Sequence, residues 1–587
     1  MTVLFLKKSS TTINGKKYHH YKIVESYREG NKVKHRILFN VGTLTDEQAE
    51  QLRLAIQVQS NPSLVVAKES DIVVTKSVAY LNVMMLHQLW KQWDLDQFFS
   101  DDRWVEALVL NRCIDPTSKI KLQSWTATTI LPTVIPALQT YDEYDVYREL
   151  DRLAKQEDPL QIFLYEQLKK HQRIHSEAFF YDITSSYFEG SRCVIAKMGY
   201  SRDHRPDREQ IVIALMITPE GYPFYWRVLE GNTQDITTVE ALVQDVRQRF
   251  GIEHCTLVFD RGMVSAHNLK IIGQQKLKYV SAMDKDEIRT TLLDEVMPDA
   301  ATPDDWEQVV AMRGFLPWDE NEFLFYRPVM LGDSRYIVTF DVQRFIDQTK
   351  NRKRQMQSVE QTINQINESL QNAKKSRKSE VVEREVNQLL SRKGLKKQVK
   401  ITVEPISLTV TTPKGNNRIV KSFRIQLEWL EDQIKNAARL DGLTCFITNM
   451  TVEEADDREV VGLYRRKNKV EEAFHEIKSH LQLRPMHVSR TERVKAHVTV
   501  CMLANFLMND MEQKLKAAHH NCSQIDVLDD LQSCLLHRIE ITSAKRKILK
   551  IQEVSDQQKQ WLQVLDCEEV LQETFKKQVL KKAEGWL

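Results

Sequence analysis

The sequence predicts an α/β protein: a mixed sheet flanked by helices, with an α+β insertion, an N-terminal β-hairpin, a helical domain and C-terminal helices. Short apolar runs typical of buried strands gather in residues 176–284, and one more such run follows at residues 443–448. Between them, residues 285–440 mix strand-like pieces with a long basic helical stretch. Helical periodicity dominates the remaining chain, so the sheet is expected to form the centre of the protein.

The composition indicates a folded protein without membrane segments. The 587 residues are 42% hydrophobic and 28% charged, which suits several domains or one domain with large insertions. The longest apolar stretch, residues 498–508, falls short of the roughly 20 residues that a membrane span needs. The apolar run near the N-terminus is too short for a signal peptide. Eight scattered cysteines without a C-x-x-C pair fit reduced thiols, and we expect a cytoplasmic protein.

The first part of the chain is predicted to hold a β-hairpin and then helices. Residues 17–42 contain two runs rich in β-branched and aromatic residues on either side of a turn, so residues 1–60 form a β-hairpin region. Apolar stripes at helical spacing predict a helical domain at residues 75–175. Such a domain can bind DNA ends or serve as a scaffold, and the pattern favours neither.

Five strands in the order β-β-β-α-β-α-β are predicted before the insertion. They are residues 178–183, 210–218, 223–229, 255–260 and 278–283. Asp182 lies inside the first strand and Asp260 ends the fourth, although buried strands rarely carry a charge. A single such aspartate is usually a structural cap, but here two are expected on adjacent strands.

The insertion is predicted to contain an antiparallel helical hairpin with a basic surface. From Lys350 to Lys400 there are 14 Lys or Arg and 5 Glu, a local charge of +9 that the overall formal charge of +2 conceals. Apolar residues from Met356 to Ala373 follow the spacing of a coiled-coil seam. A charge run of this kind is more often a solvated face, but the local excess leaves a nucleic-acid partner open.

A helix with one polar row is predicted from Tyr464 to Lys478. At about 100° per residue, one side collects an aromatic hydroxyl, two ammonium groups and a carboxylate, from Tyr464, Lys467, Glu471 and Lys478. His475 lies on the same polar face, and a neighbouring apolar stripe would pack the helix on a core. Most charged helices are solvated and carry only i,i+4 ion pairs, so a functional interpretation depends on the two aspartates.

Two strand aspartates and a helix glutamate are the donor set that a pair of Mg²⁺ ions requires, because magnesium prefers hard oxygen ligands. Two ions about 3.5 to 4 Å apart can activate a water and stabilise the leaving oxygen of a phosphodiester. Tyr464, Lys467 and Lys478 would then bind DNA phosphates. Arg261 and His475 are weaker DNA-binding candidates, since Arg261 is as often a solvated loop charge.

The chain resembles bacterial insertion-sequence transposases of the DDE superfamily, in the subgroup with a Y-R-E-K signature. The motifs that carry the resemblance are YDITSSYF around Asp182, VFDRGMVS around Asp260, and the spacing Y-x2-K-x3-E-x6-K from Tyr464 to Lys478. The runs GYSRDHRPDREQ, residues 199–210, and RPMHV, residues 484–488, are also similar. The resemblance covers roughly residues 75–510.

The resemblance implies a ribonuclease H-like catalytic core at residues 176–284 and 441–510, with an insertion domain at residues 285–440. Asp182, Asp260 and Glu471 would be its catalytic and metal-binding residues. The spacing from Tyr464 selects Glu471 over Glu472, whose side chain turns away by about 100°. Lys467 stands where the signature has arginine, so it keeps the charge but lacks the planar bidentate fork.

The resemblance further implies cut-and-paste transposition: cleavage at the element ends and strand transfer into target DNA. It implies two Mg²⁺ ions, for which Mn²⁺ substitutes, and double-stranded DNA partners, namely the terminal inverted repeats and the target. A homodimer in a synaptic complex is expected, with residues 511–587 as a helical dimerisation candidate. The protein would lie in the bacterial cytoplasm with the nucleoid.

Two other classes stay open. One is a ribonuclease H-like, metal-dependent nuclease that cuts without joining, and the other is a catalytically silent DNA-binding derivative. The intact set of three acids argues against the silent derivative. Strand transfer from pre-cleaved ends separates the nuclease from the transposase.

Overall fold

The computed structural model describes residues 3–14, 16–58, 61, 64–100, 104–175, 177–189, 192–318, 321–332, 334–411, 413 and 415–587. The chain divides into two compact units, Met1–Leu153 with Leu507–Leu587, and Ala154–Phe506. Residues 60 and 176, at which two expected boundaries fall, lie outside the described residues. The large sheet and the segment with the polar row both belong to the second unit.

The first unit begins with a three-stranded antiparallel sheet, ordered β1 (Val3–Ile13), β2 (Lys16–Glu29) and β3 (Lys32–Gly42). The predicted hairpin is confirmed as β2 and β3, and β1 adds a third strand. Helix α1 (Asp46–Val58) packs on this sheet through Ala49, which joins Leu6 and Tyr21 in a small core.

Helices make up most of the remaining first unit. They are α2 (Leu81–Gln92), α3 (Leu95–Phe98), α4 (Trp104–Ile114), α5 (Leu122–Thr126), α6 (Leu131–Val134), α7 (Glu143–Leu153), α20 (Gln524–Gln532), α21 (Asp556–Val564) and α22 (Glu573–Ala583). The expectation of helices alone after residue 511 is wrong, because β16 (Leu535–Ile541) and β17 (Arg546–Ile551) lie there and form a sheet with β4 (Ile72–Ala79). This pairing joins segments more than 400 residues apart, and local periodicity carries no signal for it.

The second unit is built on a nine-stranded mixed sheet. Its order is β10 (Leu316–Trp318), β11 (Asn321–Leu331), β12 (Ser334–Asp341), β15 (Leu443–Thr448), β9 (Lys278–Ala282), β8 (Thr256–Phe259), β5 (Ala178–Tyr187), β6 (Gln210–Ile217) and β7 (Pro223–Glu230). The pairs β5–β8 and β8–β9 are parallel, and the other pairs are antiparallel. The predicted mixed sheet is confirmed, including the return of the chain as β15.

Helices cover the sheet because its central strands are apolar on both faces. All eight residues of β6 are buried, as are eight of the ten residues of β5. Among the covering helices, α8 packs on β7 and α10 on β9, while α17 packs on β9 and β15 and α18 on β5 and β6. Outside residues 342–429, the helices of this unit are α8 (Glu157–Lys170), α9 (Val239–Gln248), α10 (Ala266–Gln274), α11 (Lys285–Thr291), α12 (Leu293–Val296), α13 (Trp306–Met312), α16 (Glu431–Ala438), α17 (Asp457–Arg466) and α18 (Asn468–Lys478), with α19 (Thr491–Ala517) extending beyond it.

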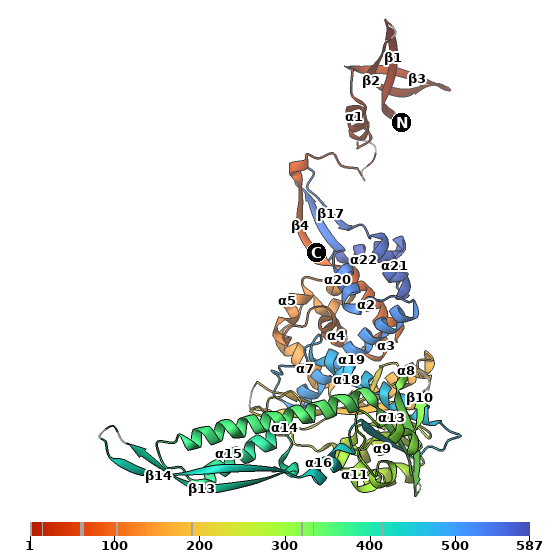
Figure 1. Ribbon diagram of the computed structural model, residues 1–587. Helices are drawn as coiled ribbons and strands as arrows, with labels where there is room; N and C mark the ends of the chain where they lie inside the picture. The colour runs from red at the N-terminus through yellow and green to blue at the C-terminus, as the bar shows by residue number, and fades with distance from the viewer. Residues whose placement is uncertain are drawn as a thin grey trace. The chain divides into compact units, whose positions relative to one another are not determined.

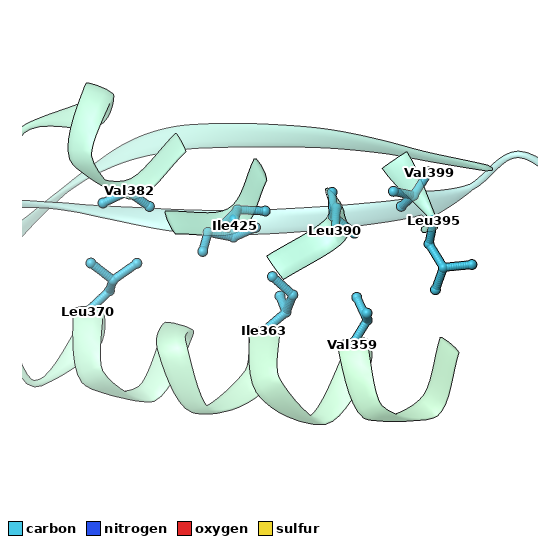
Figure 2. Close-up of a cluster of buried hydrophobic side chains, with 9 residues drawn as sticks. Val359, Ile363, Leu370, Val382, Leu390, Leu395, Val399 and Ile425 are labelled. Atoms are coloured by element: carbon cyan, nitrogen blue, oxygen red, sulfur yellow. The ribbon is translucent and has the colours of Figure 1, made fainter. Parts of the chain in front are cut away.

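The chain leaves the sheet after β12 to form a separate layer of two helices and a β-hairpin, here called the arm module (residues 342–429). It consists of α14 (Val342–Gln371), α15 (Ser379–Arg392), β13 (Val399–Thr411) and β14 (Asn417–Trp429), seen in green and teal in Figure 1. Figure 2 shows apolar side chains of α14, such as Ile363 and Leu370, facing those of α15 and of the β-hairpin, such as Leu390 and Ile425. The predicted apolar seam is therefore confirmed, and the β-hairpin shares its core.

The segment between β12 and β15, which contains the arm module and α16, begins and ends at neighbouring points of the sheet. Strands β12 and β15 are antiparallel partners, with Phe340 opposite Leu443. One residue further on, the Asp341 amide donates to the Gly442 carbonyl at 3.0 Å. Gly442 has a φ of +74°, and a Cβ there would lie 2.8 Å from the Cβ of Phe345, so glycine suits this crossing. The module thus occupies the place of a hairpin turn.

Two expectations from the composition concern thiols and membrane segments. All eight cysteines are free, and seven of them are buried. Within the part of the chain that the structure describes, no helix combines the length and the apolarity needed to span a bilayer.

Candidate active site

Asp182 and Asp260 are brought together by the parallel pairing of β5 and β8. Tyr181 and Phe259 are register partners in this pair, and each aspartate follows its partner residue directly. The two carboxylates therefore stand at the same level of adjacent strands, as the sequence predicted. Because strand pairing fixes this placement, the two carboxylates do not depend on a mobile loop for their proximity.

Asp182 lies in a pocket of concentrated negative charge. Its side chain is 15% exposed. Burial is the main cause that raises its pKa, and the charges of Asp260 and Glu471 act in the same direction. Lys467 and the backbone at Ile183 oppose this shift, and the resulting pKa is about 6. Such a site favours a bound cation, because a positive charge relieves the repulsion between the carboxylates.

The segment from Tyr464 to Lys478 is two helices, so the prediction of a single helix is wrong. Helix α17 ends at Arg466, α18 begins at Asn468, and Lys467 forms the turn between them. At this turn the Lys467 amide donates to the Tyr464 carbonyl at 3.0 Å, a bond three residues long where an α-helix would span four. The two helices rest on different strands, and the turn directs Lys467 inward.

Tyr464 holds Asp260. Its hydroxyl donates to Asp260 Oδ1 at 3.0 Å, and its ring packs on Phe446 of β15 with centroids 5.1 Å apart. Burial and the neighbouring Asp260 carboxylate raise the pKa of the Tyr464 hydroxyl, so it stays protonated and remains a donor. Tyr464 is thus joined to one of the two strand carboxylates.

Lys467 lies between Asp182 and Glu471. Its Nζ donates to Glu471 Oε1 at 3.1 Å and stands 3.9 Å from Asp182 Oδ2, while its side chain is only 5% exposed. Burial alone would lower the pKa of Lys467, but Asp182, Asp260 and Glu471 together raise it. The ammonium therefore supplies the positive charge that this cluster of acids requires.

Lys478 is directed toward other partners. Its Nζ donates to Thr184 Oγ1 and to Asp203 Oδ1, both at 2.7 Å, and its side chain is 11% exposed. Burial lowers the pKa of Lys478, and Asp203 opposes this effect. Arg484 Nη1 also binds Asp203 Oδ1, at 2.5 Å. The predicted phosphate contact of Lys478 stays a prediction, because this lysine binds a buried carboxylate here.

Asp203, Thr184 and Arg484 are polar residues of this region to which sequence reasoning gave no role. Asp203 lies within the run GYSRDHRPDREQ, and Arg484 begins RPMHV, so both fall in segments that carry the resemblance. Asp203 lies among arginines in a motif that carries the resemblance, and this placement is the one sequence signal that could have singled it out. Its burial depends on the fold and cannot be read from the sequence.

The remaining site candidates are exposed. Glu471 is 61% exposed on the first turn of α18, while the adjacent Glu472 is 64% exposed and pairs with Lys469 at 2.8 Å. Arg261, directly after Asp260, and His475, one turn after Glu471, are also exposed. These two side chains are accessible to DNA, and their contacts stay predictions.

The three acids do not yet form a closed metal site. Within the described residues, no group of three or more His, Cys, Asp or Glu side chains is arranged to hold a metal ion. The sheet brings Asp182 and Asp260 together, whereas Glu471 is turned to Lys467. The donor chemistry fits a divalent cation, because all three side chains offer hard carboxylate oxygens.

Two known protein families match parts of the chain. The chain matches the family described as "Transposase DDE domain" over residues 176–507, which is more than half of its length. The chain therefore belongs to the DDE transposase family. It also matches "IS1634 family transposase, N-terminal domain" over residues 6–63, and the protein is an enzyme of insertion-sequence transposition.

Further comparisons are more distant. The chain is similar to a piggyBac transposase in a cryo-EM structure of a synaptic complex with hairpin DNA, with a TM-score of 0.32 and 10% identity. That similarity covers 86% of this chain and 82% of the piggyBac chain. The curated proteins gave no match.

Proposed function

We propose that this transposase works by cut and paste and that Asp182, Asp260 and Glu471 are its catalytic residues and the ligands of two Mg²⁺ ions. DDE transposase domains generally depend on a divalent metal. The observation that carries the assignment is the pairing of β5 and β8, which sets two carboxylates side by side next to the Lys467 ammonium. Magnesium is the proposed ion because all three side chains offer hard oxygens, and Mn²⁺ would substitute.

The side chains have distinct tasks in this proposal. When bound, the two ions would activate a water or a 3′-hydroxyl and stabilise the leaving oxygen of the phosphodiester. Tyr464 keeps the Asp260 carboxylate oriented through its hydroxyl. Lys467 balances the acids in the free enzyme and would then donate to a DNA phosphate near the reacting strand.

The strand order supports a ribonuclease H-like interpretation of the core. Strands β7, β6 and β5 are joined as antiparallel neighbours, and β8 and β9 continue the sheet in parallel from β5. In this interpretation residues 176–284 and 441–510 form the catalytic core. The arm module and the strands before it belong to the insertion, residues 285–440.

The remaining regions receive roles in DNA binding and assembly. We assign the binding of the terminal inverted repeats to residues 1–60 and 75–175, and dimerisation in a synaptic complex to residues 511–587. Arg261 and His475 are proposed to contact the DNA backbone beside the acids, since both are exposed there. An enzyme with these partners would act on target DNA in the nucleoid.

Separate substitutions of two neighbouring glutamates test whether Glu471 is a metal ligand. Glu471→Gln should abolish Mg²⁺-dependent cleavage of a duplex that carries the element end, while binding of that duplex persists. Glu472→Gln is the matched control, because it makes the same change on an equally exposed neighbour that pairs with Lys469. Cleavage by the Glu471→Gln protein at the wild-type rate would exclude Glu471 as a ligand.

Strand transfer separates the transposase from a nuclease of the same fold. Pre-cleaved element ends with a free 3′-hydroxyl are incubated with a supercoiled plasmid and Mg²⁺, and joined products are sequenced. We expect each 3′ end to be joined to one target strand, with the two joints a short distance apart on the two strands. Cleavage without joining would indicate a nuclease, and binding without cleavage would indicate a silent derivative.

A further inference from the structure

Helix α18 carries a lysine at each end, and both lysines reach β5. Lys467 precedes its first residue and lies 3.9 Å from Asp182 Oδ2, while Lys478 is its last residue and binds Thr184 at 2.7 Å. Asp182 and Thr184 are two residues apart on β5 and therefore point to the same face of the sheet. The helix is thus attached at both ends to the strand that carries the first aspartate.

Asp203 is the counter-charge at the second of these attachments. Its side chain is 2% exposed, and its Oδ1 accepts from Lys478 at 2.7 Å and from Arg484 at 2.5 Å. A buried ammonium needs such a partner, because an unpaired charge in a dry site is strongly unfavourable. Arg484 follows α18 closely in the chain, so one carboxylate holds both the last residue of the helix and the segment after it.

The loop that carries Asp203 is itself fixed to the sheet. The Arg202 amide donates to Ser185 Oγ at 2.9 Å, and the Arg202 guanidinium binds Asp235 Oδ1 at 2.6 Å. At the start of the loop, Gly199 packs so closely that a Cβ would lie 2.2 Å from the Gly231 carbonyl oxygen. Asp203 is therefore a fixed point against which α18 is placed.

We propose that Asp203 is a positioning residue for the metal site, acting through Lys478 and α18 on Glu471. This inference rests on the proposed function, in which Glu471 is a metal ligand. Asp182 and Asp260 are placed by strand pairing, but Glu471 belongs to an 11-residue helix outside the sheet. Release of the C-terminal end of this helix changes the distance between Glu471 and the two aspartates. Asp203 thus determines whether the third carboxylate reaches the metal.

The test uses Mn²⁺ binding to the full-length protein, followed by electron paramagnetic resonance. Asp203→Asn keeps the shape of the side chain and removes its charge, and it should weaken Mn²⁺ binding about tenfold, as outer residues of metal sites do. Asp207→Asn is the matched control in the same loop, since Asp207 is 60% exposed and pairs with Arg205. The control should bind Mn²⁺ like the wild type.

Combination with Glu471→Gln shows whether Asp203 acts through Glu471. The Asp203→Asn/Glu471→Gln protein should bind Mn²⁺ no more weakly than Glu471→Gln alone, because the ligand that Asp203 positions is already missing. Wild-type binding by Asp203→Asn, or a full additional loss in the double variant, would overturn the inference. Wild-type binding by Glu471→Gln would instead reject the proposed function.

A second variant covers the case in which Asp203→Asn does not fold, as judged by circular dichroism. Asp203→Asn/Lys478→Met removes both buried charges together, so no unpaired ammonium remains. This protein should fold and still bind Mn²⁺ about tenfold more weakly than the wild type, because α18 has lost the charged attachment at its C-terminal end. Undiminished Mn²⁺ binding in the folded double variant would contradict the positioning role.

Discussion

The three acids of the site are held in two different ways. Asp182 belongs to β5 and Asp260 follows directly after β8, so the parallel register of these two strands places the aspartates at the same level. Glu471 belongs to a helix that packs on the sheet through its apolar face and is tied to β5 by Lys467 and Lys478 at its two ends. Backbone pairing thus sets the level of the two aspartates, whereas the position of Glu471 depends on side-chain packing and on charged contacts at the two ends of α18.

The largest expected effect belongs to the strand aspartates. Asp182→Asn or Asp260→Asn should lower the rate of metal-dependent cleavage by about a thousandfold, because metal ions contribute several kcal/mol to the stability of the transition state. The fold should persist, since asparagine fills the same space. Cleavage is measured on end duplexes at saturating DNA, with filter binding as the control. A variant that keeps a tenth of the wild-type rate would show that the substituted aspartate is not an essential metal ligand.

Lys467→Met tests the side-chain half of the site. Loss of the ammonium leaves Asp182 without its counter-charge. In the absence of metal, the free energy of unfolding should therefore fall by about 2 kcal/mol. The loss is smaller than for a fully buried ion pair, because the second partner of Lys467, Glu471, is exposed. Mn²⁺ should then raise the melting temperature of the variant more than that of the wild type, since the ion replaces the missing charge. If Mn²⁺ raises the melting temperature of both proteins equally, the Lys467 ammonium does not occupy the place of a bound cation.

Tyr464→Phe should have a smaller effect. The variant keeps the packing on Phe446 but loses the hydrogen bond to Asp260, which is worth about 1.5 kcal/mol for a charged acceptor. If the bond orients Asp260 during the reaction, the cleavage rate should fall about tenfold. Denaturant unfolding and cleavage rates are measured together. A rate equal to that of the wild type, with lower stability, would limit Tyr464 to a structural role.

The smallest expected effects concern DNA binding on the two sides of the site. Arg261→Ala, next to the strand aspartate, should reduce the slope of log affinity against log salt by about 0.9, the value of one phosphate contact. His475→Ala, on the helix, should change this slope by less than half as much, because an imidazole lacks the permanent charge of a guanidinium. The slopes come from fluorescence anisotropy with an end duplex. A larger change in the slope for His475→Ala than for Arg261→Ala would indicate that the DNA backbone runs along α18.

Local patterns were enough to predict the sheet and its two aspartates. The runs around Asp182 and Asp260 are short, apolar and bounded by turns, so their strands and their adjacency follow from the sequence. The seam of α14 was equally readable, because Val359, Ile363 and Leu370 recur at helical spacing. In each case the apolar pattern that predicts the element lies within one continuous segment of the sequence.

Features that depend on distant partners were not predictable. Helical periodicity runs through Lys467 without interruption, and only the contacts of α17 and α18 with different strands show why the helix breaks there. Asp203, the partner of Lys478, lies 275 residues away in a polar loop. Helical periodicity alone therefore placed Lys478 in the polar row with Glu471. Strands β16 and β17 were missed for the same reason, since β4 lies at the other end of the chain.

The junction of the arm module suggests how such a chain can be remodelled. Asp341 and Gly442 face each other across the end of one strand ladder, so removal of the residues between them would leave two strands that a short turn can connect. The hydrogen bonds that align the sheet would all be retained. The same junction offers a grafting point, at which a foreign domain with closely spaced termini could be spliced into the enzyme without shifting Asp182 or Asp260 in their strands.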